Sequence, residues 1–95
     1  MIIETPYKAG DTITAKTVAG EEIIARFVEE KGTKLKVSKP MALTMNQQGL
    51  GMVPFTFTVN PDTDVELNAN TLVFVAKTDE EMAKQYMQST TGLAI

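Results

Sequence analysis

The sequence predicts a mainly β domain: a small, strongly bent five-stranded antiparallel sheet or barrel, followed by one C-terminal helix. Thirteen threonines among 95 residues, together with many valines, isoleucines and phenylalanines, favour strands. Tight turns separate the apolar segments, and no spacing suits a parallel crossover. The apolar period becomes helical only near the end of the chain. We expect one domain over 1–95, with strands over about 12–76 and a helix over about 79–90.

Three strands of an antiparallel meander come first. Residues 13–18 alternate loosely and meet a turn at Ala19-Gly20, after which residues 22–29 form the second strand. Lys31-Gly32 turns the chain again. Residues 34–38 then alternate between lysines expected to face solvent and apolar residues expected to be buried, which predicts the third strand.

Residues 39–52 are the least regular part of the sequence. Pro40 ends or bends the third strand, and residues 46–51 are uncharged, polar and rich in glycine, which favours an exposed hairpin loop. The alternative is a mobile loop that docks onto a partner, because methionine suits adaptable contact surfaces. The apolar side chains that favour such docking are Met41, Met45, Leu50 and Met52.

The remaining strands are apolar enough to need a partner. Residues 53–59 alternate sharply, and Pro54 marks an edge strand; residues 65–67 form a short strand, and residues 71–76 are apolar on both faces. An open apolar edge promotes aggregation unless something pairs with it. We therefore expect the edge strands 53–59 and 71–76 to pair between copies in a closed ring.

The last segment is predicted to be a helix. Thr78 and Glu81 have the spacing of a capping box, in which Thr78 caps the first amides. An apolar stripe at helical spacing suits packing on the sheet, and its members are Met82, Ala83, Tyr86 and Met87. Gly92 is the expected stop, and the apolar tail Leu93-Ala94-Ile95 follows it.

Composition argues against an enzyme. The chain has no histidine and no cysteine, which excludes Ser-His-Asp triads, Cys-His dyads, Cys/His zinc sites and disulfides. We expect no catalysis, no cofactor and no metal. An all-oxygen metal site is the remaining enzymatic alternative. Its candidate acids are Asp11, Glu21, Glu22, Asp62, Asp64 and Glu66.

The charge is acidic overall but unevenly spread. The net charge of −3 argues against coating nucleic acid by bulk attraction. Lysines gather over residues 26–39, acids over 60–95, and residues 40–59 carry no charge. Any binding of nucleic acid should therefore be local and sensitive to salt. The N-terminus does not look like a signal peptide, and no apolar segment is long enough to cross a bilayer. We therefore expect the protein to be cytoplasmic and not associated with a membrane.

Two short patterns point to a family. The first runs over Thr17–Val28, with Gly20 in its turn, and continues with Leu35 and Val37; the second is Leu67-Asn68-Ala69-Asn70-Thr71-Leu72. With the order of the strands, they resemble the two motifs of the Sm/LSm (Hfq-like) fold over roughly residues 12–76. The segment 84–95, with Asn46-Gln47-Gln48-Gly49, is similar to small uncharacterised proteins of T4-type marine phages.

The resemblance implies an SH3-like barrel class, a cyclic homo-oligomer of about five to seven copies, and binding of single-stranded RNA, with DNA as an alternative, in RNA or DNA processing or regulation. A phage origin implies the cytoplasm of the bacterial host. The ring would gather loops 29–34 and 67–71 around one pore, where lysines contact phosphates and the polar side chains contact bases or sugars. The implied binding residues are Lys31, Thr33, Lys34, Asn68 and Asn70.

The chain departs from the family in three places. The asparagine of the first motif is lost near Lys34, Asn68-Ala69 stands where the second motif has Arg-Gly, and the helix follows the sheet instead of preceding it. The alternative function is a protein-interaction or assembly module with an SH3-like barrel. Its contacts would be the neutral loop 41–52 and the tail 93–95.

Overall fold

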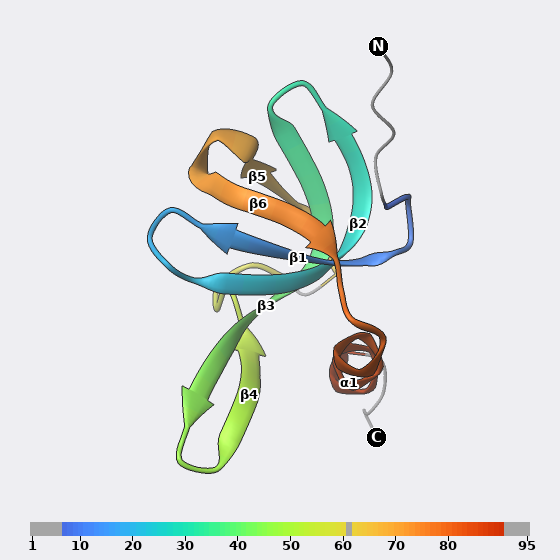
Figure 1. The fold of residues 1–95 in the computed structure, drawn as a ribbon. Coiled ribbons are helices and arrows are strands. Elements are labelled where there is room, and N and C mark those ends of the chain that lie inside the picture. Colours follow the sequence, from blue (N-terminus) through green and yellow to red (C-terminus); the bar gives the residue numbers. More distant parts are fainter. Residues whose placement is uncertain (1–6, 61, 91–95) are drawn as a thin grey trace.

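The computed structural model describes residues 7–60 and 62–90 and shows a mainly β chain with a C-terminal helix (Figure 1). The strands are β1 (Thr12–Thr17), β2 (Glu22–Lys31), β3 (Lys34–Asn46), β4 (Gly49–Pro54), β5 (Val65–Asn68) and β6 (Leu72–Lys77). A 3₁₀ turn, η1 (Ala69–Thr71), joins β5 to β6, and helix α1 (Glu80–Thr90) follows β6. The strands form one antiparallel sheet in the order β4-β3-β2-β1-β6, with β5 also paired to β3.

Strand β3 pairs with β2 along one edge, and because it bends in the middle its other edge is shared by two strands. Its first part pairs with β5 over 34–37, and its last part pairs with β4 over 41–46. At the bend Lys39 has a left-handed φ of 49° and Pro40 is buried. The Tyr86 hydroxyl from α1 donates to the carbonyls of Ser38 at 3.1 Å and Lys39 at 2.8 Å. Pro40 therefore bends the third strand and does not end it.

The structure corrects the prediction for residues 39–52. They form the second half of β3 and most of β4, a regular hairpin that projects from the rest of the sheet (Figure 1). The two-residue turn suits this hairpin because Gln48 N–H donates to Asn46 Oδ1 at 2.8 Å and Gly49 takes a φ of +115°. The sheet therefore has six strands, where a five-stranded sheet was predicted, and β4 lies earlier in the chain than the predicted strand over 53–59.

The predicted strand over 53–59 is wrong in its extent, since only residues 53 and 54 belong to a strand. β4 ends at Pro54, which lies opposite Met41, and residues 55–60 form no strand. Phe55 N–H still donates to the carbonyl of Pro40 at 3.0 Å, but Pro40 has no N–H to return. Pairing stops where the partner strand bends, whatever the alternation of the sequence.

The core lies on the inner face of the curled sheet. Its buried cluster is Ile13, Ala25, Phe27, Leu35 and Val37, with partly buried Tyr7, Val65, Leu67, Leu72 and Val75 packed against it. The rings of Tyr7 and Phe27 meet edge to face at 4.8 Å. Burial, and secondarily Glu30, raises the pKa of Tyr7.

Helix α1 packs on the outer face, where its Tyr86 and the β2 residue Ile24 are fully buried. The predicted capping residue is corrected: Asp79 Oδ2 accepts from the N–H groups of Glu81 at 3.1 Å and Met82 at 3.4 Å. The Thr78 hydroxyl instead bonds that of Thr14 at 2.9 Å, because Thr78 still runs beside β1. The predicted stop at Gly92 and the tail 93–95 lie outside the described residues. In residues 7–60 and 62–90, α1 is the one α-helix, and it is neither long nor apolar enough to cross a membrane.

Candidate nucleic-acid interface

The two loops that the sequence singled out lie together at one end of the sheet. Lys34 at the start of β3 pairs with Asn68 at the end of β5. The Ala69 N–H of η1 donates to the carbonyl of Thr33 in the β2–β3 turn at 2.8 Å. Loops 29–34 and 67–71 are thus joined by backbone pairing, although more than 30 residues separate them in the chain.

Lys31 and Lys34 face each other across the β2–β3 turn. They are directly opposite in the register, both are exposed, and Gly32 between them takes the positive φ of 59° that the tight turn needs. Like charges placed directly opposite each other destabilise a strand pair slightly. Neither lysine belongs to the three ion pairs found in the described part of the chain. An anion bound at this turn would relieve their repulsion.

The other cations of residues 26–39 are already engaged. Lys36 Nζ lies 3.6 Å from Glu29 Oε2, and Lys39 Nζ lies 3.5 Å from Asp62 Oδ1. Arg26 Nη2 donates to the Met87 sulfur at 2.8 Å. Among the lysines of residues 26–39, Lys31 and Lys34 are therefore the two that lie outside the ion pairs, while Arg26 keeps its positive charge because the Met87 sulfur is neutral.

The asparagines of the second loop differ in what they offer. Asn68 Oδ1 accepts from the Asn70 N–H at 2.9 Å, and the Asn68 carbonyl accepts from the Thr71 hydroxyl at 2.7 Å. Asn68 therefore shapes η1 with its side-chain oxygen, which leaves its NH₂ group as the polar atom it offers. Asn70 and Thr33 are exposed on either side of it. The register thus places Lys31, Lys34 and Asn68 side by side, and Thr33 and Asn70 are exposed in the same two loops.

The acids of the alternative metal site do not gather. Among the described residues, no group of three Asp or Glu side chains is placed to hold a metal ion. Asp11 accepts from the Lys8 N–H at 3.0 Å and lies 3.9 Å from Lys77 Nζ, while Asp62 is occupied by Lys39.

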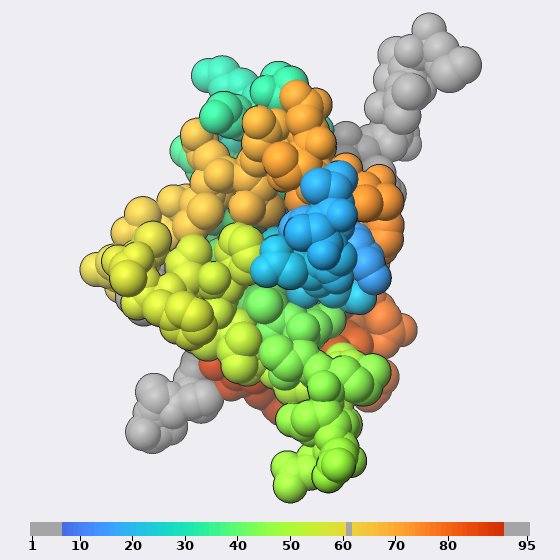
Figure 2. Space-filling view, turned by 90° about the vertical axis from the view of Figure 1, so that its left-hand side faces the viewer, coloured from blue at the N-terminus to red at the C-terminus, as the bar shows by residue number. Residues whose placement is uncertain are grey.

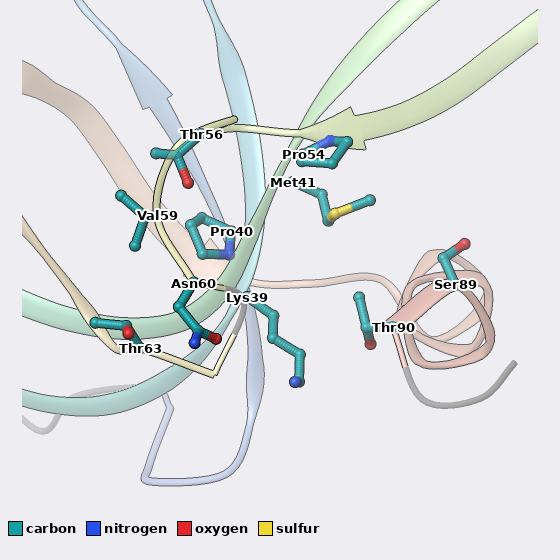
Figure 3. A pocket seen from close by; sticks show the side chains of 10 residues that line it. All are labelled: Lys39, Pro40, Met41, Pro54, Thr56, Val59, Asn60, Thr63, Ser89 and Thr90. Carbon is teal, nitrogen blue, oxygen red and sulfur yellow. The ribbon is translucent and has the colours of Figure 1, made fainter. Parts of the chain in front are cut away.

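A hollow of about 250 Å³, which the sequence did not indicate, lies between the bend of β3, the base of β4 and the end of α1 (Figure 3). Pro40, Met41, Pro54 and Val59 give it apolar walls, and Lys39 borders it. It exists only because β3 bends, so no local sequence pattern announces it. Residues 61 and 91–95, which adjoin its lining in the chain, lie outside the described residues.

Comparison with protein-family models gives no match, and comparison with curated proteins finds no significantly similar sequence.

Proposed function

We propose that the chain is an Sm-like, ring-forming protein that binds single-stranded nucleic acid, RNA before DNA, at the end of the sheet where loops 29–34 and 67–71 meet. The observation that carries this proposal is the pair of exposed lysines opposite each other beside η1. Two ammonium groups suit consecutive phosphates, and the neighbouring amides suit bases or sugars.

Open strand edges support assembly into a ring. β6 ends the sheet on one side, and on the other side β4 and β5 each pair only with β3. Val73 on β6 is 63% exposed and Phe74 is 46% exposed, which leaves apolar surface at this edge. Unlike edges at the two ends of one sheet favour head-to-tail pairing, which closes into a ring when the rotation between copies fits. Since residues 55–60 form no strand, we propose β5 and β6 as the paired edges.

Ring closure would also strengthen a weak site. β5 and β6 flank η1, so pairing β5 of one copy with β6 of the next brings successive η1 turns close together. Each turn presents Asn68 and Asn70 beside the lysines of the β2–β3 turn. A strand of nucleic acid that contacts several copies gains affinity through effective concentration, although each contact is weak.

The test is binding of fluorescein-labelled uridine-rich and adenine-rich oligonucleotides, followed by fluorescence anisotropy across a salt series. We expect the double variant Lys31→Ala/Lys34→Ala to raise the Kd at least about 10-fold and to lower the salt slope by about 0.7 for each phosphate that the variant no longer neutralises. The matched control is Lys84→Ala, which removes an exposed lysine of α1 outside the three ion pairs. Its Kd should stay within about twofold of the original protein, because Lys84 lies on neither of the two loops.

Two results would contradict the proposal. One is the absence of binding by the unaltered protein below about 100 μM at low salt, where phosphate contacts are strongest. The other is an equal loss of affinity in the Lys84→Ala control, which would mean that binding depends on surface cations in general and not on the two lysines of the turn.

A further inference from the structure

The β3–β4 hairpin carries one face made entirely of apolar side chains. Directly opposite residues of an antiparallel pair point to the same face, and the register pairs Met41 with Pro54, Leu43 with Met52, and Met45 with Leu50. The tip of this ladder is open, since Met45 is 75% and Leu50 49% exposed. Figure 2 shows the light-green hairpin projecting at the lower end of the molecule.

Two hollows border this face, and Leu50 lines both of them. On one side, Leu50 and Met52 face Met82 and Gln85 of α1 across a hollow. On the other, Leu43, Met45 and Leu50 border a second hollow against the β1–β2 turn, which lies directly above the hairpin in Figure 2. Methionines at a groove adapt to apolar partners of different shapes. We call this surface the Met groove, defined by Leu43, Met45, Leu50, Met52 and Met82.

The rim of the Met groove is acidic. Glu21 and Glu22 border the hollow beside the β1–β2 turn, with Lys16 as the cation among them. Glu81 lies one helical turn before Gln85 and so shares its side of α1, where Lys84 is the neighbouring cation; the rim thus carries three acids against Lys16 and Lys84. None of these three acids takes part in the three ion pairs of the described chain. The hairpin between the two parts of the rim carries no charge.

We propose that the Met groove binds the apolar face of a basic amphipathic segment of another protein. The exposed Met45 and Leu50 supply the apolar contact, and the acidic rim supplies the charge complementarity that selects lysine- and arginine-rich flanks. The same rim disfavours nucleic acid, whose phosphates it repels. It also disfavours a symmetric dimer through this face, which would bring the acids of two rims together. The inference concerns a surface away from Lys31 and Lys34 and does not depend on nucleic-acid binding.

The experiment uses the full chain and a fluorescein-labelled 18-residue peptide of leucine and lysine, with leucines at positions i, i+3, i+4 and i+7. Two peptide controls have the same length: one has the same composition with leucines spread around the helix, and one has glutamate in place of lysine. We expect micromolar binding of the first peptide, and at least about 10-fold weaker binding of both controls.

Protein variants separate apolar docking from simple charge attraction. Met45→Asp/Leu50→Asp adds two negative charges, so a purely electrostatic site would bind the basic peptide more tightly. We expect the opposite, a Kd raised at least about 10-fold, because the apolar ladder loses its open end. The matched control is Phe57→Asp, at a side chain that is 83% exposed and borders neither hollow. It should leave the Kd within about twofold, since Phe57 does not touch the peptide.

The rim is tested by Glu21→Lys/Glu22→Lys, which should raise the Kd and flatten its dependence on salt. Circular dichroism checks that each variant keeps its fold. If the aspartates disturb the hairpin, Met45→Gln/Leu50→Gln removes the same apolar surface with neutral side chains. The Kd of the basic peptide for this variant should then be raised in the same way.

Three outcomes overturn the proposal. The first is that the basic peptide fails to bind below about 200 μM, a concentration at which a specific groove would be occupied. The second is that the variants at Met45 and Leu50 leave the affinity for the basic peptide unchanged or increase it. The third is that the glutamate peptide binds as tightly as the basic peptide. Sedimentation velocity of the protein alone tests whether a second copy of the chain occupies the Met groove instead. If Met45→Asp/Leu50→Asp lowers the mass of the assembly, a second copy fills the groove and the partner protein is refuted.

Discussion

Tyr86 connects helix α1 to the residue at which β3 bends. Its hydroxyl donates to two successive carbonyls, and its side chain is fully buried. We expect Tyr86→Phe to lower the free energy of unfolding by about 1–2 kcal/mol, because two partly buried carbonyls lose the hydroxyl that donates to them while the ring still packs. Urea denaturation measures the loss. The matched control is Tyr7→Phe: Tyr7 packs edge to face on Phe27, and no hydrogen bond of its hydroxyl is found within the described residues. A larger loss in the control than in Tyr86→Phe would contradict this role.

The same residue gives stability a dependence on alkaline pH. Burial raises the pKa of Tyr86 to about 12, and Arg26 offsets part of that rise. In the unfolded chain a tyrosine titrates near pH 10, so between these values the unfolded state gives up its proton first. The contribution of the neutral phenol is complete below about pH 10 and is lost as the pH rises toward 12. In Tyr86→Phe the fall of stability over this range should therefore be shallower.

At the scale of the elements, the start of α1 depends on Asp79. Its carboxylate accepts from two of the first amides of the helix, and its charge suits the positive end of the helix dipole. We expect Asp79→Ala to lower the free energy of unfolding by about 1 kcal/mol. Asp79→Asn keeps an oxygen that accepts the same bonds and should recover most of the loss. Thermal unfolding compares the three proteins, and an asparagine variant as unstable as the alanine variant would argue against capping.

The elements also show how far the sequence determines the fold. Local alternation and turn residues predicted strands near β1, β2, β5 and β6, the first part of β3, and the helix. They failed over residues 39–59, because what happens there is decided from a distance. Tyr86 satisfies two carbonyls at the bend, which lets β3 pass through Pro40, and the missing N–H of Pro40 ends β4. A strand pattern cannot report where its partner turns away.

At the scale of the whole molecule, the edge strand β6 exposes the apolar side chains of Val73 and Phe74. We expect light scattering to give a mass of several chains for the unaltered protein, and Val73→Lys to shift it toward one chain, because an edge lysine opposes strand pairing. Phe57→Lys makes the same change at an exposed residue of the segment 55–60, which has no strand edge to offer. Its mass should stay unchanged. A single-chain mass for the unaltered protein at micromolar concentration would refute the ring.

The charge pattern, too, becomes specific only in the whole molecule. The sequence placed an excess of lysines over residues 26–39, and the resemblance selected five residues of two loops. The structure brings these loops together through Ala69 and Thr33, and it removes Lys36 and Lys39 from the free cations by pairing them with acids. Those pairings depend on strand register, which composition does not contain.

The division of the outer edge of β3 between β4 and β5 has a consequence for how the chain tolerates change. Beyond Ala42, β3 pairs only with β4, and none of the core cluster lies on this part of the hairpin. We expect residues added at Gln47-Gln48 to leave the barrel-like part of the sheet unaltered, since a longer turn costs little loop-closure entropy. The hairpin is therefore the place where related chains can differ most in length, and where a fused tag would disturb the fold least.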